Sequence, residues 1–204
     1  AYWDAKRNIL RYSGRGDFAV YNPDFDVVAH WVDESACRGI PIDPHAAIDM
    51  TRWKVWGDHN RQNALLAISA AGILGVSEAD ALSALQTFEP LPHRLQEVAR
   101  INGVTFIDNA IGGNPAATIA AMTAVAEADM KLGCVIVGGV DRGYDFGALA
   151  RAIHTLGVSS LVLLPDTGRR IRDALPLGCN PCCYETDNID DAVRWAAGRC
   201  SPDT

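Results

Sequence analysis

The chain has 204 residues, of which 49% are hydrophobic and 21% are charged, and its formal net charge is -7 at pH 7. This composition is typical of a folded protein with a sizeable core and excludes disorder over most of the length. The negative charge argues against a general nucleic-acid-binding protein, and the longest apolar run, residues 64–76, is too short to span a bilayer. Because no signal-peptide pattern is present at the amino end, we expect a cytoplasmic protein that binds no membrane.

The first part of the chain predicts helices and short strands in alternation. Its expected elements are a helix, a strand, a helix or extended piece, and loops with short edge strands, over residues 1–12, 18–21, 27–31 and 37–56. The last of these edge strands is expected to carry Trp53, Val55 and Trp56. A helix follows over residues 57–73, and Ser77 is the expected N-cap of a second one, which together make a helical hairpin.

The second part predicts a parallel sheet. The prolines of Glu89-Pro90-Leu91-Pro92 stop helix formation, so we expect two domains, residues 1–90 and 91–204. Asn102-Gly103 predicts a hairpin, after which helices and strands alternate. The expected helices cover residues 115–126, 146–156, 168–174 and 189–197, and the expected strands cover residues 134–137 and 160–164. This alternation predicts an α/β fold with a mainly parallel, Rossmann-like sheet.

The six cysteines are concentrated near the carboxyl end. Cys179, Cys182 and Cys183 have the spacing of half a zinc site, but no second pair of ligands follows at a suitable distance. We therefore interpret the cysteines as reduced thiols without a metal.

The stretch over residues 104–118 has a strand, a glycine-containing loop and a helix start in succession. The glycines are Gly112 and Gly113, and Pro115 suits the first turn of a helix. Such a junction presents backbone N–H groups at the carboxyl end of a strand, where open α/β sheets bind ligands. A plain connector is the alternative interpretation, since many such turns bind nothing.

Four further groups of polar residues have two interpretations each. Asn60 and Asn63, beside His59, can hold a ligand or cap a helix, and Arg94 can bind a phosphate or pair with a nearby glutamate. The glycine-rich residues 138–143 follow a strand and include Arg142, which can grip a carboxylate with two hydrogen bonds. Lys6 taken alone is an ordinary surface lysine.

Taken together and in order, these groups resemble the successive motifs of the Mur ligases. The matching stretches are Tyr2-Trp-Asp-Ala-Lys6, Gly57-Asp-His-Asn60 with Asn63, Leu91-Pro-His-Arg94, Phe106 to Pro115, and Gly138-Gly-Val-Asp-Arg-Gly143. The nearest branch is the one that adds glutamate to UDP-N-acetylmuramoyl-L-alanine. The resemblance implies the latter part of a central ATPase domain followed by an amino-acid-binding domain.

The resemblance also implies roles for individual residues. Lys6 matches a lysine that is carbamylated and helps to hold Mg. His59 and Arg94 match residues beside the reacting nucleotide, and with Lys6 they are the implied catalytic residues. The implied ATP-binding residues are His59, Asn60, Asn63, Arg94, Asp108 and Asn109. The implied substrate-binding residues are Arg142, which takes the place of a lysine that binds the carboxylate of the amino acid, with Ile111 and Gly113. The implied partners are nucleotide, a UDP-linked muramoyl substrate and glutamate, and a monomer is expected.

The implied reaction phosphorylates a carboxylate with ATP, after which the amino group of glutamate attacks the acyl phosphate. The loop departs from the family pattern, because residues 109–114 lack the usual lysine and hydroxyls, and Ile111 occupies the lysine position. Isoleucine there, together with Arg142, is closer to an L-glutamate-adding branch. The enantiomer and the acceptor therefore stay open.

Two alternatives to the glutamate ligase are also open. One is a Mur-type ligase acting on another carboxylate, and the other is a non-catalytic nucleotide-binding relative. No Gly-x-x-x-x-Gly-Lys-Ser/Thr motif occurs in the 204 residues. We therefore expect a fragment of a longer protein that is inactive alone.

Overall fold

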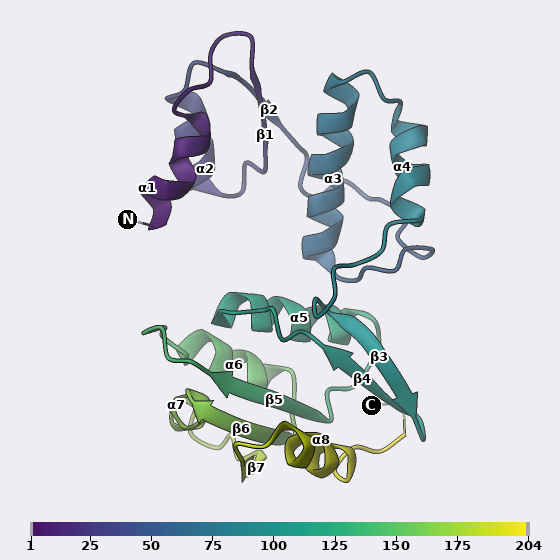
Figure 1. Cartoon of the computed structure of the whole chain (residues 1–204), viewed down its shortest axis with the longest axis vertical. Coiled ribbons are helices and arrows are strands. Elements are labelled where there is room, and N and C mark those ends of the chain that lie inside the picture. The colour runs from purple at the N-terminus through teal and green to yellow at the C-terminus, as the bar shows by residue number, and fades with distance from the viewer. Residues whose placement is uncertain (1, 203–204) are drawn as a thin grey trace. The chain divides into compact units, whose positions relative to one another are not determined.

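A computed structural model describes residues 2–202 (Figure 1). The chain divides into two compact units, residues 1–89 (unit 1) and residues 90–204 (unit 2). Among the described residues, no helix combines the length and the apolar character that crossing a membrane requires.

Unit 1 combines a βαβ motif with a helical hairpin (Figure 1). Its elements are α1 (Tyr2–Arg7), the 3-10 turn η1 (Asn8–Leu10), β1 (Phe18–Tyr21), α2 (Asp26–Asp33), β2 (Arg38–Pro41), α3 (Asp58–Ile73) and α4 (Glu78–Gln86). Strands β1 and β2 pair in parallel, with Phe18 opposite Arg38. A β-carbon at Gly39 would lie 2.7 Å from Val32 Cγ1, so the absence of a side chain lets α2 pack closely on β2.

The helical hairpin of unit 1 follows the predicted signals. Ser77 caps α4, and its hydroxyl accepts a hydrogen bond from the backbone N–H of Asp80 at 3.2 Å. Gly75 ends the preceding turn with a φ of 86°, a left-handed conformation that glycine adopts without steric cost. The predicted pair of helices is confirmed.

Unit 2 begins with an antiparallel hairpin of β3 (Gln96–Ile101) and β4 (Val104–Asp108). Asn102 and Gly103 have φ angles of 53° and 80°, the left-handed pair that a two-residue hairpin turn needs. Helix α5 (Pro115–Glu127) follows, and the Asn114 side chain caps it by accepting from the N–H of Ala117 at 2.9 Å.

A three-stranded parallel sheet in the order β5-β6-β7 forms the centre of unit 2. The elements are β5 (Cys134–Gly139), α6 (Gly147–Thr155), β6 (Ser160–Asp166), α7 (Gly168–Asp173), β7 (Cys182–Glu185) and α8 (Ile189–Ala197). Leu161 and Leu163 of β6 point into the main core, whereas Val162 between them packs with Ala192 of α8. The alternation shows that helices cover both faces of the sheet, and the predicted α/β fold is confirmed.

Two details differ from the sequence-based expectation. Residues 51–57 form turns and bends instead of an edge strand, and Trp53 is buried through a turn in which its N–H donates to the Met50 carbonyl at 3.0 Å. Strand β7 was not expected, because Cys182–Glu185 follows Asn180-Pro181 and lacks β-branched residues. Its place is decided by parallel pairing with β6, which is non-local.

Leu161→Ala tests the central position of β6. The side chain is fully buried, so its loss removes apolar contacts and leaves a cavity. We expect the free energy of unfolding to fall by about 3 kcal/mol. Urea denaturation of the whole chain measures the change, and Leu177→Ala, at a fully exposed position, is the matched control. Equal effects of the two substitutions would contradict the assignment of the core.

Candidate functional site

The start of α3 carries the polar residues of unit 1 that the sequence analysis singled out. Successive helical residues are rotated by about 100°, so positions 59, 60 and 63 lie on one side of the helix and positions 58, 61 and 62 on the other. His59 and Asn60 are half-buried, and Asn63 is exposed. Asn60 donates from Nδ2 to the Trp56 carbonyl at 2.8 Å, which orients its side-chain oxygen.

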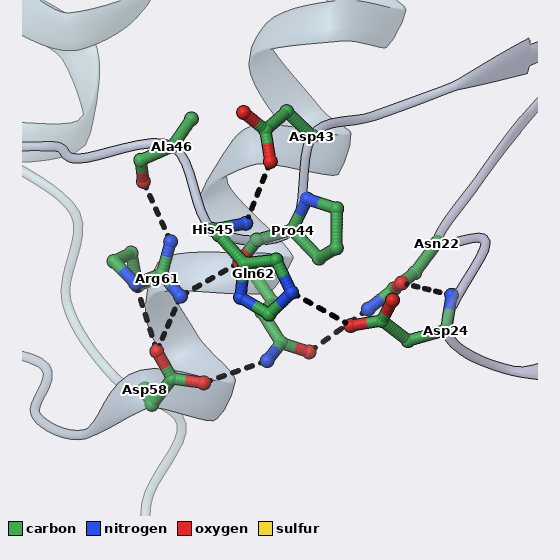
Figure 2. A network of polar contacts seen from close by, with 9 residues as sticks. All are labelled: Asn22, Asp24, Asp43, Pro44, His45, Ala46, Asp58, Arg61 and Gln62. Atoms are coloured by element: carbon green, nitrogen blue, oxygen red, sulfur yellow. Dashed lines mark hydrogen bonds and ion pairs between the residues drawn. The ribbon is translucent and has the colours of Figure 1, made fainter.

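The opposite side of the helix start belongs to a network that ties three segments together (Figure 2). Arg61 donates to the Ala46 carbonyl at 2.6 Å and to the Pro44 carbonyl at 2.7 Å, and its Nε donates to Asp58 Oδ1 at 2.8 Å. Arg61 and Gln62 both donate to Asp58, which holds the pKa of its carboxyl below the usual value. The network therefore stabilises the ionised form of the Asp58 carboxyl.

Gln62 extends this network to the end of β1. Its Nε2 donates to Asp58 Oδ2 at 2.6 Å, and its Oε1 accepts from Asn22 Nδ2 at 3.0 Å. Asn22 is only 5% exposed and also accepts from the N–H of Asp24 at 2.9 Å. Because β1 and β2 are parallel, the segments after both strands lie at one edge, where the network joins them to α3.

In unit 2, two loops that each contain predicted site residues are bonded to each other. The His93 Nδ1 lies 2.7 Å from Asp108 Oδ2, and the N–H of Ile111 donates to the His93 carbonyl at 3.2 Å. Asn109 Oδ1 accepts from the N–H of Leu95 at 3.2 Å. These bonds hold the loop after β4 against residues 93–95, with His93 and Leu95 in left-handed conformations at φ values of 62° and 47°.

In this arrangement, Asp108 and Asn109 form hydrogen bonds within unit 2, whereas the Arg94 side chain is available to bind a ligand. Hydrogen bonds from His93 and from the N–H of Ala110 lower the pKa of Asp108. Arg94 is exposed, and within the described part of unit 2 its guanidinium makes no hydrogen bond or ion pair. Glu97, a partner considered for it in the sequence, pairs with Arg100 instead.

The glycine-rich residues 138–143 leave the carboxyl end of β5. A β-carbon at Gly138 would lie 2.3 Å from the Leu164 carbonyl oxygen, so only glycine allows β5 and β6 to approach at this point. Asp141 accepts from Arg170 Nη1 at 2.5 and 2.6 Å and from the N–H of Gly143 at 2.8 Å. The backbone bond from Gly143, followed by the bond from Arg170, lowers the pKa of Asp141.

Arg170 also fixes the rest of this loop. Its Nη2 donates to the Tyr144 carbonyl at 2.9 Å, and its guanidinium carbon lies 5.0 Å from the centre of the Phe146 ring. Arg142 is exposed, and among the described residues its guanidinium makes no ion pair or hydrogen bond. A β-carbon on Gly113 would lie 3.5 Å from Arg142 Nη1, so the two predicted substrate-binding residues are neighbours.

The remaining predicted residues are placed individually. Ile111 is 52% exposed in the loop after β4, and Lys6 is exposed on α1. Within residues 2–202, no group of three or more His, Cys, Asp or Glu could hold a metal. All six cysteines are free thiols, and burial raises the pKa of Cys134 to about 12.

Sequence reasoning did not identify Arg61 and Arg170. A signal existed for Arg61, because Asp58, Arg61 and Gln62 have the i, i+3, i+4 spacing of one helix face. No local signal existed for Arg170, which reaches Asp141 only through the folding of the sheet.

Comparison with known proteins shows which protein family this chain resembles. A family model described as "Mur ligase, glutamate ligase domain" matches residues 93–204. The UDP-N-acetylmuramoylalanine--D-glutamate ligase of Geobacillus sp. (strain WCH70) is 33% identical over 213 residues, which cover 95% of this chain and 46% of the relative. The ligase with the same description from Natranaerobius thermophilus is 30% identical over 219 residues, with coverages of 96% and 46%. The chain thus spans about half the length of the curated relatives it matches.

Solved structures show the same fold. MurF from Acinetobacter baumannii aligns with a TM-score of 0.75 at 17% identity, covering 96% of this chain and 48% of that one. The folylpolyglutamate synthase of Mycobacterium tuberculosis aligns with a TM-score of 0.66 at 19% identity, covering 89% and 48%. These similarities concern the fold.

Asp108→Asn tests the bond between the two loops of unit 2. Since the folded state lowers the pKa of Asp108 below 3.8, its carboxylate contributes stability above that value and loses it as the pH falls through the folded-state pKa. We expect the wild type to be more stable than Asp108→Asn at about pH 6, and the difference to shrink toward about pH 3.

Urea unfolding of the whole chain at the two pH values measures this difference. Asp187→Asn, at an exposed position of unit 2, is the control for the loss of one negative charge. A difference that stays constant with pH would contradict a stabilising role for the Asp108 carboxylate.

Proposed function

The chain belongs to the Mur ligase family, and on that premise we propose that it is part of an ATP-dependent ligase that joins glutamate to UDP-N-acetylmuramoyl-L-alanine. The observation that carries the proposal is the match of residues 93–204 to a glutamate ligase domain, within which Gly113 and the exposed Arg142 are neighbours. The ligase would act in peptidoglycan synthesis in the cytoplasm as a monomer.

We propose nucleotide-binding residues in each unit, taken separately. In unit 1, His59, Asn60 and Asn63 share one side of the α3 start, and their ring nitrogens and amides are groups that can hydrogen-bond a nucleotide. In unit 2, Arg94 offers a guanidinium that is suited to a phosphate. The M. tuberculosis folylpolyglutamate synthase, whose fold is similar, was solved in complex with ADP and AMPPCP, which supports a nucleotide as ligand.

Asp108 and Asn109 keep their proposed place beside the nucleotide, with a modified role. Each uses one side-chain oxygen to hold the loops together, through His93 and Leu95 respectively. The second carboxylate oxygen of Asp108 accepts from Ala110, so neither of its oxygens is without a bond. Their main contribution is then to position Arg94 and the loop after β4.

The metal assignment depends on a modification of Lys6. An unmodified ammonium group repels Mg²⁺, and the described residues contain no carboxylate cluster that would replace it. If Lys6 is carbamylated, it becomes an anionic oxygen ligand on α1. We therefore propose Lys6 as the magnesium-binding residue and derive no catalytic step through the metal.

For the incoming amino acid, Arg142 is the proposed carboxylate-binding group. Asp141 lies next to it in sequence but is already bonded by Arg170, so it does not neutralise Arg142. Ile111 and Gly113 both lie in the loop after β4 and carry no charge. The absence of a β-carbon on Gly113 leaves room beside the Arg142 guanidinium.

In the proposed reaction, a carboxylate oxygen of the muramoyl substrate attacks the γ-phosphorus of ATP and ADP leaves. The amine of glutamate then attacks the acyl carbon, the C–O bond to phosphate breaks, and phosphate leaves with the proton that the amine gives up as the amide forms. The part of this chain is to position and neutralise charges through Arg94, Arg142 and the α3 start.

The sequence of the loop after β4 favours a second candidate function. Residues 109–114 lack the lysine and the hydroxyls that are usual in the family, and Ala110, Ile111 and Gly113 occupy those positions. A Mur-type ligase for another carboxylate, or a nucleotide-binding relative without catalysis, would also be compatible with such a loop.

Phosphate release by the full-length protein distinguishes these candidates. The assay combines ATP, magnesium and UDP-N-acetylmuramoyl-L-alanine with D-glutamate or L-glutamate in turn. We expect release that depends on one enantiomer of glutamate. Nucleotide binding without phosphate release would favour the non-catalytic relative, and release without either enantiomer would contradict a glutamate ligase.

Arg142→Ala should raise the Michaelis constant for glutamate by about tenfold or more and leave that for ATP unchanged, because a charge-assisted pair with the carboxylate is lost. Arg100→Ala, an exposed arginine on β3, is the control. Steady-state kinetics of the full-length protein measure both constants. A change confined to the constant for ATP would exclude the carboxylate role.

A further inference from the structure

The Arg61 side chain donates hydrogen bonds from all three of its guanidinium nitrogens (Figure 2). It is only 17% exposed, and its guanidinium donates to two backbone carbonyls and one carboxylate. Ordering a long arginine side chain costs conformational entropy, which these hydrogen bonds offset. The bonds to Pro44 and Ala46 therefore fix the loop after β2 to the first turn of α3.

The bonds are on the side of α3 opposite to the proposed ligand residues. Residues 58, 61 and 62 lie on the face of α3 that takes part in the network, whereas residues 59, 60 and 63 lie on the opposite face. The bonds of Arg61 and Asp58 on one side of α3 therefore determine the direction in which His59 and Asn63 project on the other side. A small rotation of this turn would move all three ligand side chains together.

The rest of the network supports the same arrangement from the β1 side. Gln62 links Asp58 to the buried Asn22, so the helix start is bonded to the segments after both strands. His45 and Asp24 also meet in this network, with His45 Nε2 3.6 Å from Asp24 Oδ2. The first turn is thus attached at two points, through Arg61 to the segment after β2 and through Gln62 to the segment after β1.

We propose that Arg61 is a positioning residue for the nucleotide: it holds the first turn of α3 in the rotation at which His59, Asn60 and Asn63 contact ATP. The inference rests on the proposed function, because it takes ATP as the ligand of these three residues. Arg61 itself touches no nucleotide in this scheme. Lysine at the same position could reach only part of the three acceptors, since it lacks the planar fork of donors.

The test uses the full-length protein that contains this chain. Arg61→Ala, Arg61→Lys and the control Arg15→Ala, at an exposed arginine of unit 1, are compared for kcat, for the Michaelis constants of ATP and glutamate, and for Tm. We expect Arg61→Ala to raise the constant for ATP by about tenfold, with the constant for glutamate unchanged. Arg61→Lys should give an intermediate increase, and Arg15→Ala none.

The split between the two constants separates positioning from mere stabilisation. A purely structural role would lower Tm and kcat through a loss of folded protein and leave both Michaelis constants unchanged, which would overturn the proposal. If Arg61→Ala does not fold, the test relies on the Michaelis constant of Arg61→Lys for ATP. A value equal to that of the wild type would overturn the proposal. A wild-type protein that binds no ATP would refute the proposed function, and this inference with it, before any variant is compared.

Discussion

Parallel pairing of strands is the constraint on which the arrangement of both units depends. In unit 1 it places the segments after β1 and β2 at one edge, and in unit 2 it does the same for β5, β6 and β7. Parallel strands need crossovers, so helices begin near the same edges. The start of α3 and residues 138–143 lie at such edges, whereas Arg94, Asp108 and Asn109 belong to the segments of the antiparallel β3–β4 hairpin and its flanks.

Each unit then uses an arginine to set the geometry of its own edge: Arg61 is largely buried, whereas Arg170 is exposed. Arg61 binds Asp58 and two carbonyls, and Arg170 binds Asp141 and the Tyr144 carbonyl. In both cases the arginine binds the carboxylate of an aspartate, Asp58 or Asp141. These carboxylates are therefore already paired and do not compete with a ligand for the residues next to them. For Arg142 this matters directly, since the adjacent Asp141 would otherwise be its nearest counter-charge.

Much of the fold could be predicted because its signals are local. The turn at Asn102-Gly103, the cap at Ser77 and the helix start at Pro115 each depend on a few neighbouring residues, and the structure contains all three. Strand β7 could not be predicted, since a four-residue segment without β-branched side chains becomes a strand only through β6. Trp53 misled the prediction because aromatic residues favour strands and buried turns alike.

The sequence by itself determined the chemistry of the candidate site: which residues carry amides, guanidinium groups and glycines, and in what order these follow strands and caps. Only the tertiary structure decided which of those groups are bonded internally. Asp108, Asn109 and Asp141 are held by His93, Leu95 and Arg170, whereas Arg94 and Arg142 are not paired within the described residues. The physical reason is that a hydrogen bond depends on distances of about 3 Å, which for these pairs arise from the packing of loops and strands and not from spacing along the chain.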